Sequence, residues 1–422
     1  MVTLAVALGV GRFAFTPLLP LMLHGGAFGQ PPIDIEHGGW LASFNYAGYF
    51  VGALTCAALR VEPARVVRAG LALTVLLTLA MGVTSQFWVW AVVRFVAGAV
   101  SAWTFVFASQ WGLRRLAELR QPAWSGVIYT GPGVGIVGTG LLVSAAGGYG
   151  ATAGWIGFGL ISAVLAAAVW PAFGNAAASD RKAAGRASAS SATERRASDV
   201  AAATSDETGA SRAGAATTRH PTVNSAPATH RADAFWLVVL YGVPGFGYII
   251  TATFLPVIAR HALPGSPWPD LFWPMFGAAL MVGALLAARL PLHLDNRVLL
   301  AGSYVLQAAG IALGIVWPTA GGFSLGSILI GVPFTAITLF AMREARRLRG
   351  DDAAGLMGYA TAAYGLGQIV GPLVAAPIAA HTGSFSLALW LAAGALLVGA
   401  AGLVVVARMP RGRGRMPDCG CG

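Results

Sequence analysis

The chain contains two similar apolar segments, separated by about half of its length. The two copies are Gly9-Val-Gly-Arg12-Phe-Ala-Phe-Thr-Pro-Leu-Leu-Pro20 and Gly245-Phe-Gly-Tyr248-Ile-Ile-Thr-Ala-Thr-Phe-Leu-Pro256, which place glycine, leucine and proline at matching positions. Phe107-Ala108 and Phe340-Ala341 repeat at a similar offset. Self-similarity of this kind indicates a fold built from two related halves.

Composition places both halves in a membrane. The 422 residues are 56% hydrophobic and 10% charged, with a mean hydropathy of +0.70, which excludes an ordinary soluble domain. A helix needs about 20 apolar residues to cross a bilayer. Stretches of that kind lie near 2–23, 38–59, 66–84, 87–112, 122–146, 150–173, 234–260, 271–290, 297–317, 321–342, 353–380 and 385–407. We therefore predict an all-α membrane protein with twelve transmembrane helices in two pseudo-symmetric six-helix bundles.

The predicted domains are an N-terminal bundle over 1–173 and a C-terminal bundle over 234–407. Residues 174–233 contain no aromatic residue, and Val200 and Val223 are their only branched aliphatic residues. Such a segment buries too little apolar surface to offset its conformational entropy, so we expect a disordered linker. Residues 408–422 form a tail.

The positions of the cations predict the orientation. Nearly all of the 27 lysine and arginine residues lie in the linker, in the tail or on loops that follow even-numbered spans. The positive-inside rule then places both termini and the linker in the cytoplasm. This pattern also explains the net charge of +11 without a nucleic-acid partner.

Two arginines carry the functional argument. All 16 acidic residues fall outside the spans or at their ends, so no carboxylate relay through the core is predicted, whereas Arg12 and Arg94 lie well inside spans. A charged side chain at the centre of a membrane helix costs at least about 2.5 to 3.5 kcal/mol, and it usually faces a cavity or a partner. One hypothesis is that they bind an anionic substrate, because guanidinium matches carboxylate geometry. The alternative is helix packing, in which each arginine caps backbone carbonyls freed by nearby glycine and proline.

Uncharged polar residues at similar depth complete the predicted substrate site. Asn45 and Gln368 are expected to face a wet cavity or a neighbouring helix, because an amide in hydrocarbon leaves its donors unmatched. Tyr248 occupies the repeat position of Arg12, which suggests an asymmetric site with a cation on one wall and a phenol opposite. Ordinary packing is the alternative for Tyr248.

Glycine-rich stretches in the fifth and eleventh spans predict close helix contacts. Gly131-Pro132 begins one stretch and Gly371-Pro372 ends the other, and both are candidates for gating or for static helix packing. The three cysteines imply no disulfide framework, and Cys419 and Cys421 supply too few ligands for a closed metal site. No metal and no cofactor are predicted.

Together these features resemble the major facilitator superfamily. Arg94-Phe-Val-Ala-Gly98 is similar to that family's fourth-helix motif, and Gly131-Pro132 is similar to its fifth-helix motif, which is often associated with exporters. The loop after the second span lacks the aspartate that the family usually carries there. Three segments resemble the YbfB/YjiJ-like bacterial permeases: Gly9–Pro20, Asn45-Tyr-Ala-Gly-Tyr49 and Gly367-Gln-Ile-Val-Gly-Pro372. The resemblance implies a monomer in the bacterial cytoplasmic (inner) membrane.

The sequence therefore predicts a secondary active or facilitative transporter that moves a small organic anion by alternating access. Export of lipophilic, drug-like compounds is the alternative within transport, and a non-transporting membrane sensor of the same fold is a third hypothesis. An enzyme is not predicted, because the sequence shows no nucleophile and base pair, metal-ligand set or phosphate loop at a workable spacing.

Overall fold

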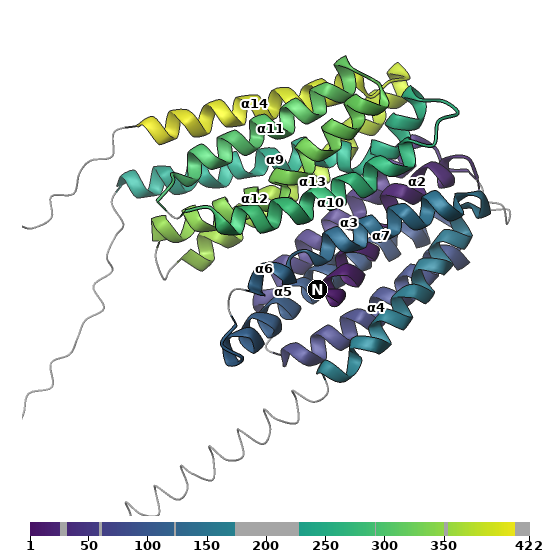
Figure 1. Cartoon of the computed structure of the whole chain (residues 1–422), viewed down its shortest axis with the longest axis horizontal. Coiled ribbons are helices and arrows are strands. Elements are labelled where there is room, and N and C mark those ends of the chain that lie inside the picture. Colours follow the sequence, from purple (N-terminus) through teal and green to yellow (C-terminus); the bar gives the residue numbers. More distant parts are fainter. Residues whose placement is uncertain are drawn as a thin grey trace, which may run out of the picture.

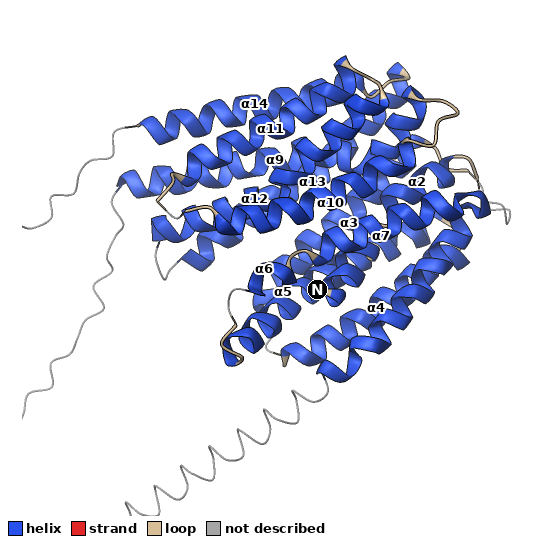
Figure 2. Ribbon diagram, viewed as in Figure 1, coloured by secondary structure: helices blue, strands red, loops and turns tan. Residues whose placement is uncertain are grey.

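Helices form all of the regular secondary structure in the described part of the chain (Figure 2). The computed structural model describes residues 1–25, 32–58, 61–121, 124–173, 228–291, 293–349 and 353–409. Most of the predicted linker and tail, including Cys419 and Cys421, lies outside these residues.

The first half begins with a broken helix. Val2–Leu23 spans the bundle as α1 (Val2–Leu4), the π-helix η1 (Ala5–Val10) and α2 (Phe15–Leu23). The other helices of this half are α3 (Ile35–Thr55), α4 (Pro63–Val83), α5 (Phe87–Glu118), the short α6 (Ser125–Ile128), α7 (Gly131–Ala146) and the helix Gly150–Phe173.

The second half contains six helices in the described residues, and its first helix is continuous where the first half has a break. They are α9 (Ala228–Ala262), α10 (Pro269–Arg289), α11 (Asn296–Val316), α12 (Ala320–Arg349), α13 (Ala353–Thr382) and α14 (Ser386–Arg408). Figure 1 shows these helices grouped together above those of the first half.

The predicted fold is confirmed. Within the described residues, 11 helices are long and apolar enough to cross a membrane. The remaining long helix, α3, has 21 residues but is more polar, since it carries Glu36, His37 and Asn45. It packs between α5 of its own half and α13 of the other half, so protein rather than lipid covers much of its surface.

The repeat seen in the sequence produces the same helix crossing in both halves. A Cβ atom on Gly9 would lie 2.3 Å from Cα of Gly135, so the first helix crosses α7 at backbone contact. A Cβ atom on Gly367 would lie 2.5 Å from the carbonyl oxygen of Gly242 and 3.0 Å from the carbonyl carbon of Gly245, which joins α13 to α9 in the same way. Small residues permit this close approach.

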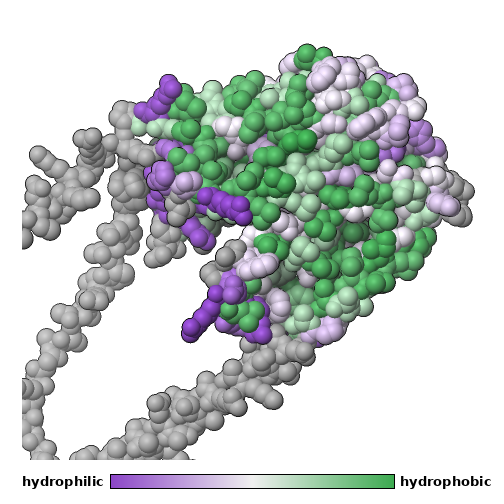
Figure 3. Space-filling view, in the orientation of Figure 1, coloured by the Kyte–Doolittle hydropathy of each residue, from purple (hydrophilic) through white to green (hydrophobic). Residues whose placement is uncertain are grey.

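The most extensive contacts between the two halves in the described residues are those of α3 with α13, α7 with α10, and α2 with α9. Glycine again sets the distance, because a Cβ atom on Gly133 would lie 2.8 Å from the carbonyl oxygen of Gly277, and one on Gly39 would lie 2.6 Å from Cβ of Ala376. We call the end of the molecule that carries Glu118, Ala228 and Arg408 the linker end, and the opposite end the far end. Hydrophilic residues gather at the linker end, where the surface is hollowed between the halves (Figure 3).

The boundary of the predicted linker differs from the structure. Helix α9 begins at Ala228, so the last six residues of the predicted 174–233 segment are helical. One of them, Asp233, forms an ion pair of 2.5 Å with the buried Arg297 of α11, which gives the first turns of α9 a partner that hydropathy does not reveal. Helix α14 ends at Arg408, one residue beyond the predicted end of the second bundle.

The glycine crossing generates a stability prediction. In Gly135→Ala the new Cβ would lie 2.5 Å from the carbonyl oxygen of Ala5 and from Cα of Gly9, and such overpacking costs about 1–3 kcal/mol. Gly138→Ala, on the same helix, is the control because no atom lies within 4 Å of the new Cβ and alanine favours the helix by about 1 kcal/mol. Thermal unfolding in one detergent should show a lower melting temperature only for Gly135→Ala. Equal melting temperatures would contradict the crossing.

Candidate functional site

The break in the first helix positions Arg12. In η1 the amides of Gly11 and Phe13 donate to the carbonyls of Val6 and Leu8, each at 3.0 Å, and residues 11–14 then form a turn before α2 begins. In a regular helix the amide of Thr16 would donate to the Arg12 carbonyl, but here it donates to Phe13 at 3.2 Å. The Arg12 carbonyl therefore needs a donor from elsewhere.

Arg94 of α5 supplies that donor. Its Nη2 donates to the Arg12 carbonyl and its Nε to the Leu41 carbonyl, each at 3.4 Å, and its Cζ lies 4.7 Å from the centroid of the Phe15 ring. The side chain is only 2% exposed. Arg94 thus joins the broken helix and α3 to α5, which is the geometry expected of the packing alternative.

Asn45 also contacts this scaffold. Its Nδ2 donates to the Arg94 carbonyl at 2.8 Å, and the side chain is fully buried. A Cβ atom on Gly98 would lie 2.0 Å from the Asn45 carbonyl oxygen. The four-residue spacing of Arg94 and Gly98 therefore places both residues on the face of α5 that packs against α3.

Arg12 points the other way, toward the second half. Its Nη2 donates to Oε1 of Gln368 on α13 at 2.8 Å, and Nε2 of Gln368 donates to the hydroxyl of Tyr248 on α9. The structure thus brings three of the five predicted substrate-site residues into one hydrogen-bonded chain between the halves. Arg94 and Asn45 lie behind this chain.

Aromatic rings of the first half surround the Arg12 guanidinium. Its Cζ lies 4.1 Å from the ring centroid of Tyr49, 5.2 Å from that of Tyr46 and 5.3 Å from that of Phe13. The hydroxyl of Tyr46 lies 3.0 Å from Oγ1 of Thr253 across the interface. Sequence reasoning did not assign Tyr46 and Tyr49 to the site, although their three-residue spacing on α3 is the signal that they share a helix face.

The charge of Arg12 has no carboxylate partner among the described residues. The side chain is 5% exposed, it forms none of the ion pairs found there, and its Nε has no hydrogen-bond acceptor. Cation–π contacts with three rings offset part of the desolvation cost. The Nε–H group is therefore a buried donor that an additional acceptor would satisfy.

The four glycine and proline residues predicted for gating or packing lie at two kinds of contact. Gly131 packs against the first helix, where a Cβ atom would lie 2.5 Å from the Met1 carbonyl oxygen, and Gly371 packs against Ile249 of α9. Pro132 is buried at the start of α7. Pro372 lies between the halves, because its carbonyl oxygen would be 3.1 Å from a Cβ atom on Gly39.

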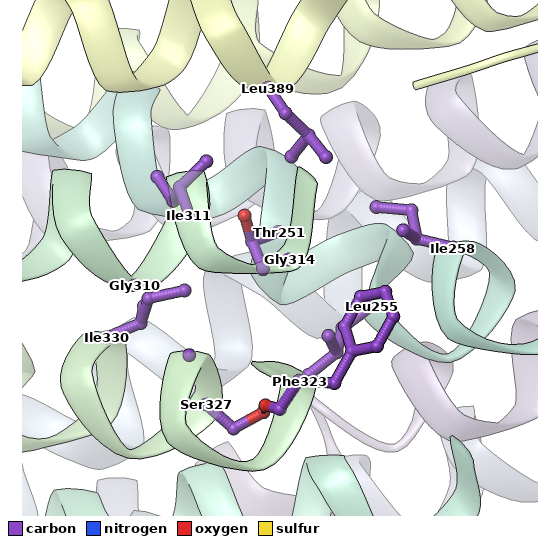
Figure 4. A pocket seen from close by; sticks show the side chains of 11 residues that line it. Thr251, Leu255, Ile258, Gly310, Ile311, Gly314, Phe323, Ser327, Ile330 and Leu389 are labelled. Carbon is purple, nitrogen blue, oxygen red and sulfur yellow. The ribbon is translucent and has the colours of Figure 1, made fainter. Parts of the chain in front are cut away.

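A separate cavity lies inside the second half, away from Arg12 (Figure 4). It is a small pocket of about 20 Å³ lined by residues of α9, α11, α12 and α14. Thr251 and Ser327 supply the hydroxyl groups of its lining, which contains no charged residue. None of the predicted site residues lines this cavity.

Comparison with known proteins identifies the family. The sequence matches the family described as "Uncharacterised MFS-type transporter YbfB" over residues 4–205 and 209–405. The chain belongs to this family of major facilitator transporters. The predicted family is therefore confirmed, and the protein is a multi-pass membrane transporter.

The comparison with solved structures supports the same fold. A crystal structure of a mutant of the nucleoside transporter NupG is similar over 96% of this chain and 98% of that chain, with a TM-score of 0.65 and 12% sequence identity. At this identity the likeness concerns the fold alone. No curated protein matches the sequence.

An ion-pair cluster in this transporter was not foreseen from the sequence. Glu344 was placed at the end of a span, and the structure buries it completely, with Oε1 at 2.7 Å from Nε of Arg297 and 2.5 Å from Nη2 of Arg347. Arg297 also contacts Asp233 and the Val406 carbonyl, so the cluster joins α9, α11, α12 and α14 at the linker end. The three-residue spacing of Glu344 and Arg347 was the available signal.

The different surroundings of the two intramembrane arginines generate a second stability prediction. In Arg94→Met the buried Arg12 carbonyl loses its donor, which costs about 1–3 kcal/mol, and the contact with the Leu41 carbonyl of α3 is also lost. Arg12→Met keeps a similar volume and removes a charge that has no carboxylate partner in the described residues. It frees only the side-chain oxygen of Gln368, which can reorient, whereas a backbone carbonyl cannot, so its cost is smaller. Thermal unfolding in detergent should give the lower melting temperature for Arg94→Met. The reverse order would contradict the scaffold role of Arg94.

Proposed function

We propose that the protein moves a small organic anion across the membrane by alternating access, with Arg12 as the anion-binding group. The observation that supports this most directly is a buried guanidinium between the two halves with no carboxylate partner in the described residues and an unused Nε. Guanidinium binds carboxylates through paired N–H groups, so a carboxylate is the natural acceptor. The chemistry is binding and movement, with no bond made or broken.

The Arg12–Gln368 hydrogen bond gives substrate binding a way to influence the interface. It connects the first helix of one half with α13 of the other. An entering carboxylate competes with the Gln368 oxygen for the same guanidinium, and it offers a stronger, charge-assisted acceptor. Substrate binding therefore replaces a contact between the halves by a contact with substrate.

Other side-chain hydrogen bonds between the halves, within the described residues, lie between Arg12 and the far end. Thr16 donates to the Ala252 carbonyl at 2.9 Å, Ser43 donates to the Ile369 carbonyl at 3.0 Å, and the Tyr46 and Thr253 hydroxyls lie 3.0 Å apart. A neutral hydrogen bond contributes about 0.5–1.5 kcal/mol net. A ligand can shift a conformational equilibrium only by the difference between its affinities for the two states. Contacts of this size between the halves are weak enough for the binding of one substrate molecule to change the equilibrium.

Transport in reconstituted vesicles tests the role of Arg12. For whichever labelled organic anions the parent takes up, Arg12→Ala should slow uptake by about 10- to 100-fold, since hydrogen bonds to charged groups contribute about 1.5–3 kcal/mol. Arg12→Lys should recover part of the rate, because lysine keeps the charge but not the planar fork. Arg65→Ala, which removes an exposed arginine at the linker end, is the control for lost positive charge.

The outcomes distinguish the hypotheses. Uptake of every tested anion at the parental rate by folded Arg12→Ala protein would refute the arginine-centred site. If the vesicles expelled lipophilic dyes and moved no anion, the drug-export alternative would replace the proposal.

We also propose that the linker end faces the cytoplasm of a bacterial cell and that the protein acts as a monomer in the inner membrane. The support is the cluster of hydrophilic residues at that end (Figure 3), which includes the exposed Arg115 and Arg408.

Labelling with a membrane-impermeant maleimide checks the orientation. In a background without native cysteines, Gly148→Cys at the far end should react in intact spheroplasts, whereas Arg65→Cys should react only after lysis. Labelling of Arg65→Cys in intact spheroplasts would show the opposite orientation.

A further inference from the structure

We infer that the transported anion is an aromatic carboxylate, with Tyr364 as the residue that selects the ring. The inference rests on the proposed role of Arg12 and adds the class of substrate. The observation behind it is that aromatic rings from both halves surround the Arg12–Gln368 contact.

The second half supplies a three-ring stack. Tyr241 and Tyr248 lie seven residues apart on α9, which places them on one face of that helix. Tyr364 of α13 stacks on both, with centroids 5.0 Å from Tyr241 and 5.9 Å from Tyr248 and interplanar angles of 24° and 20°. Phe334 meets Tyr248 edge-on at 4.9 Å.

This stack begins beside the anion-binding group. Tyr364 precedes Gln368 by four residues on α13, so the two side chains lie on the same face about one helical turn apart. Tyr241 and Tyr248 are buried at 3% and 0% exposure, whereas Tyr364 is partly exposed. A carboxylate held by Arg12 therefore places an attached ring beside Tyr364, on the linker side of the site.

The charges of the site further restrict the chemical class of the substrate. A cationic substrate would be repelled by Arg12, and an amino acid would bring an ammonium group to a site without a carboxylate in the described residues. Because Tyr241 and Tyr248 cover the faces of Tyr364, a substrate ring meets its partly exposed edge, and aliphatic acids satisfy Arg12 without gaining this ring contact. Edge-to-face aromatic pairs add about two- to twelvefold in affinity beyond the burial of area.

Matched acids test the inference with the full chain in proteoliposomes. Benzoate is compared with cyclohexanecarboxylate, and phenylacetate with cyclohexylacetate, because each pair shares its charge and carbon count. The parent should take up the aromatic member about two- to twelvefold faster at concentrations well below saturation. L-Phenylalanine should compete poorly with either acid.

Three variants assign the preference to Tyr364. Tyr364→Leu should bring the aromatic-to-saturated ratio close to one while uptake of the saturated acids continues. Tyr364→Phe should keep the ratio, because it retains the ring. Tyr359→Leu removes a tyrosine of the same helix that is 73% exposed and should change nothing.

The results separate this inference from the proposed function. Equal, Arg12-dependent uptake of both members of each pair, or Arg12-dependent uptake of aliphatic acids alone, would overturn the aromatic inference and leave anion transport standing. An aromatic preference that survives in folded Tyr364→Leu protein would overturn the role of Tyr364. If no acid depended on Arg12, the proposed function itself would fail.

Discussion

A positive charge held within apolar helices without a carboxylate partner in the described residues is the constraint on which the site depends. Two arginines have different roles in this arrangement. Arg94 satisfies the carbonyl that the broken first helix exposes, and this contact fixes the turn from which Arg12 extends. Arg12 then reaches across the interface to Gln368 and lies against the ring of Tyr49. The break, the scaffold and the binding group are therefore parts of one arrangement.

The two halves share their helix crossings but not their polar groups. At the repeat position of Arg12 the second half has Tyr248, so the cation belongs to one half and the hydrogen-bonding phenol to the other. At the linker end the same contrast recurs, because Glu344 corresponds to Trp111. The first half packs Trp111 against Phe173, with centroids 4.6 Å apart, where the second half uses a buried ion-pair cluster. The two halves thus share their backbone contacts, and they differ in the polar side chains at the interface.

Hydropathy and the internal repeat were sufficient to predict the spans, because crossing a bilayer demands length and apolarity that few other folds require. They were not sufficient to separate Arg12 from Arg94. Each appears in the sequence as a lone charge in an apolar span, and only the position of the π-helix shows which carbonyl needs a donor. The burial of Glu344 and the start of α9 at Ala228 were not predicted for a similar reason. Both depend on ion pairs between helices that are distant in the sequence, and such pairs leave no periodic pattern in it.

The strength of the contacts within and between the halves explains how such a molecule can move. In the second half a buried Arg297–Glu344 pair joins two helices, whereas none of the ion pairs among the described residues joins the two halves. Breaking a buried pair costs about 3–5 kcal/mol, whereas each neutral hydrogen bond between the halves contributes about 0.5–1.5 kcal/mol. This difference supports the proposal that the halves move as bodies and that the contacts between them rearrange. In the proposed mechanism, a carboxylate that exchanges with Gln368 on Arg12 acts where this weaker set of contacts meets a buried charge without a carboxylate partner in the described residues.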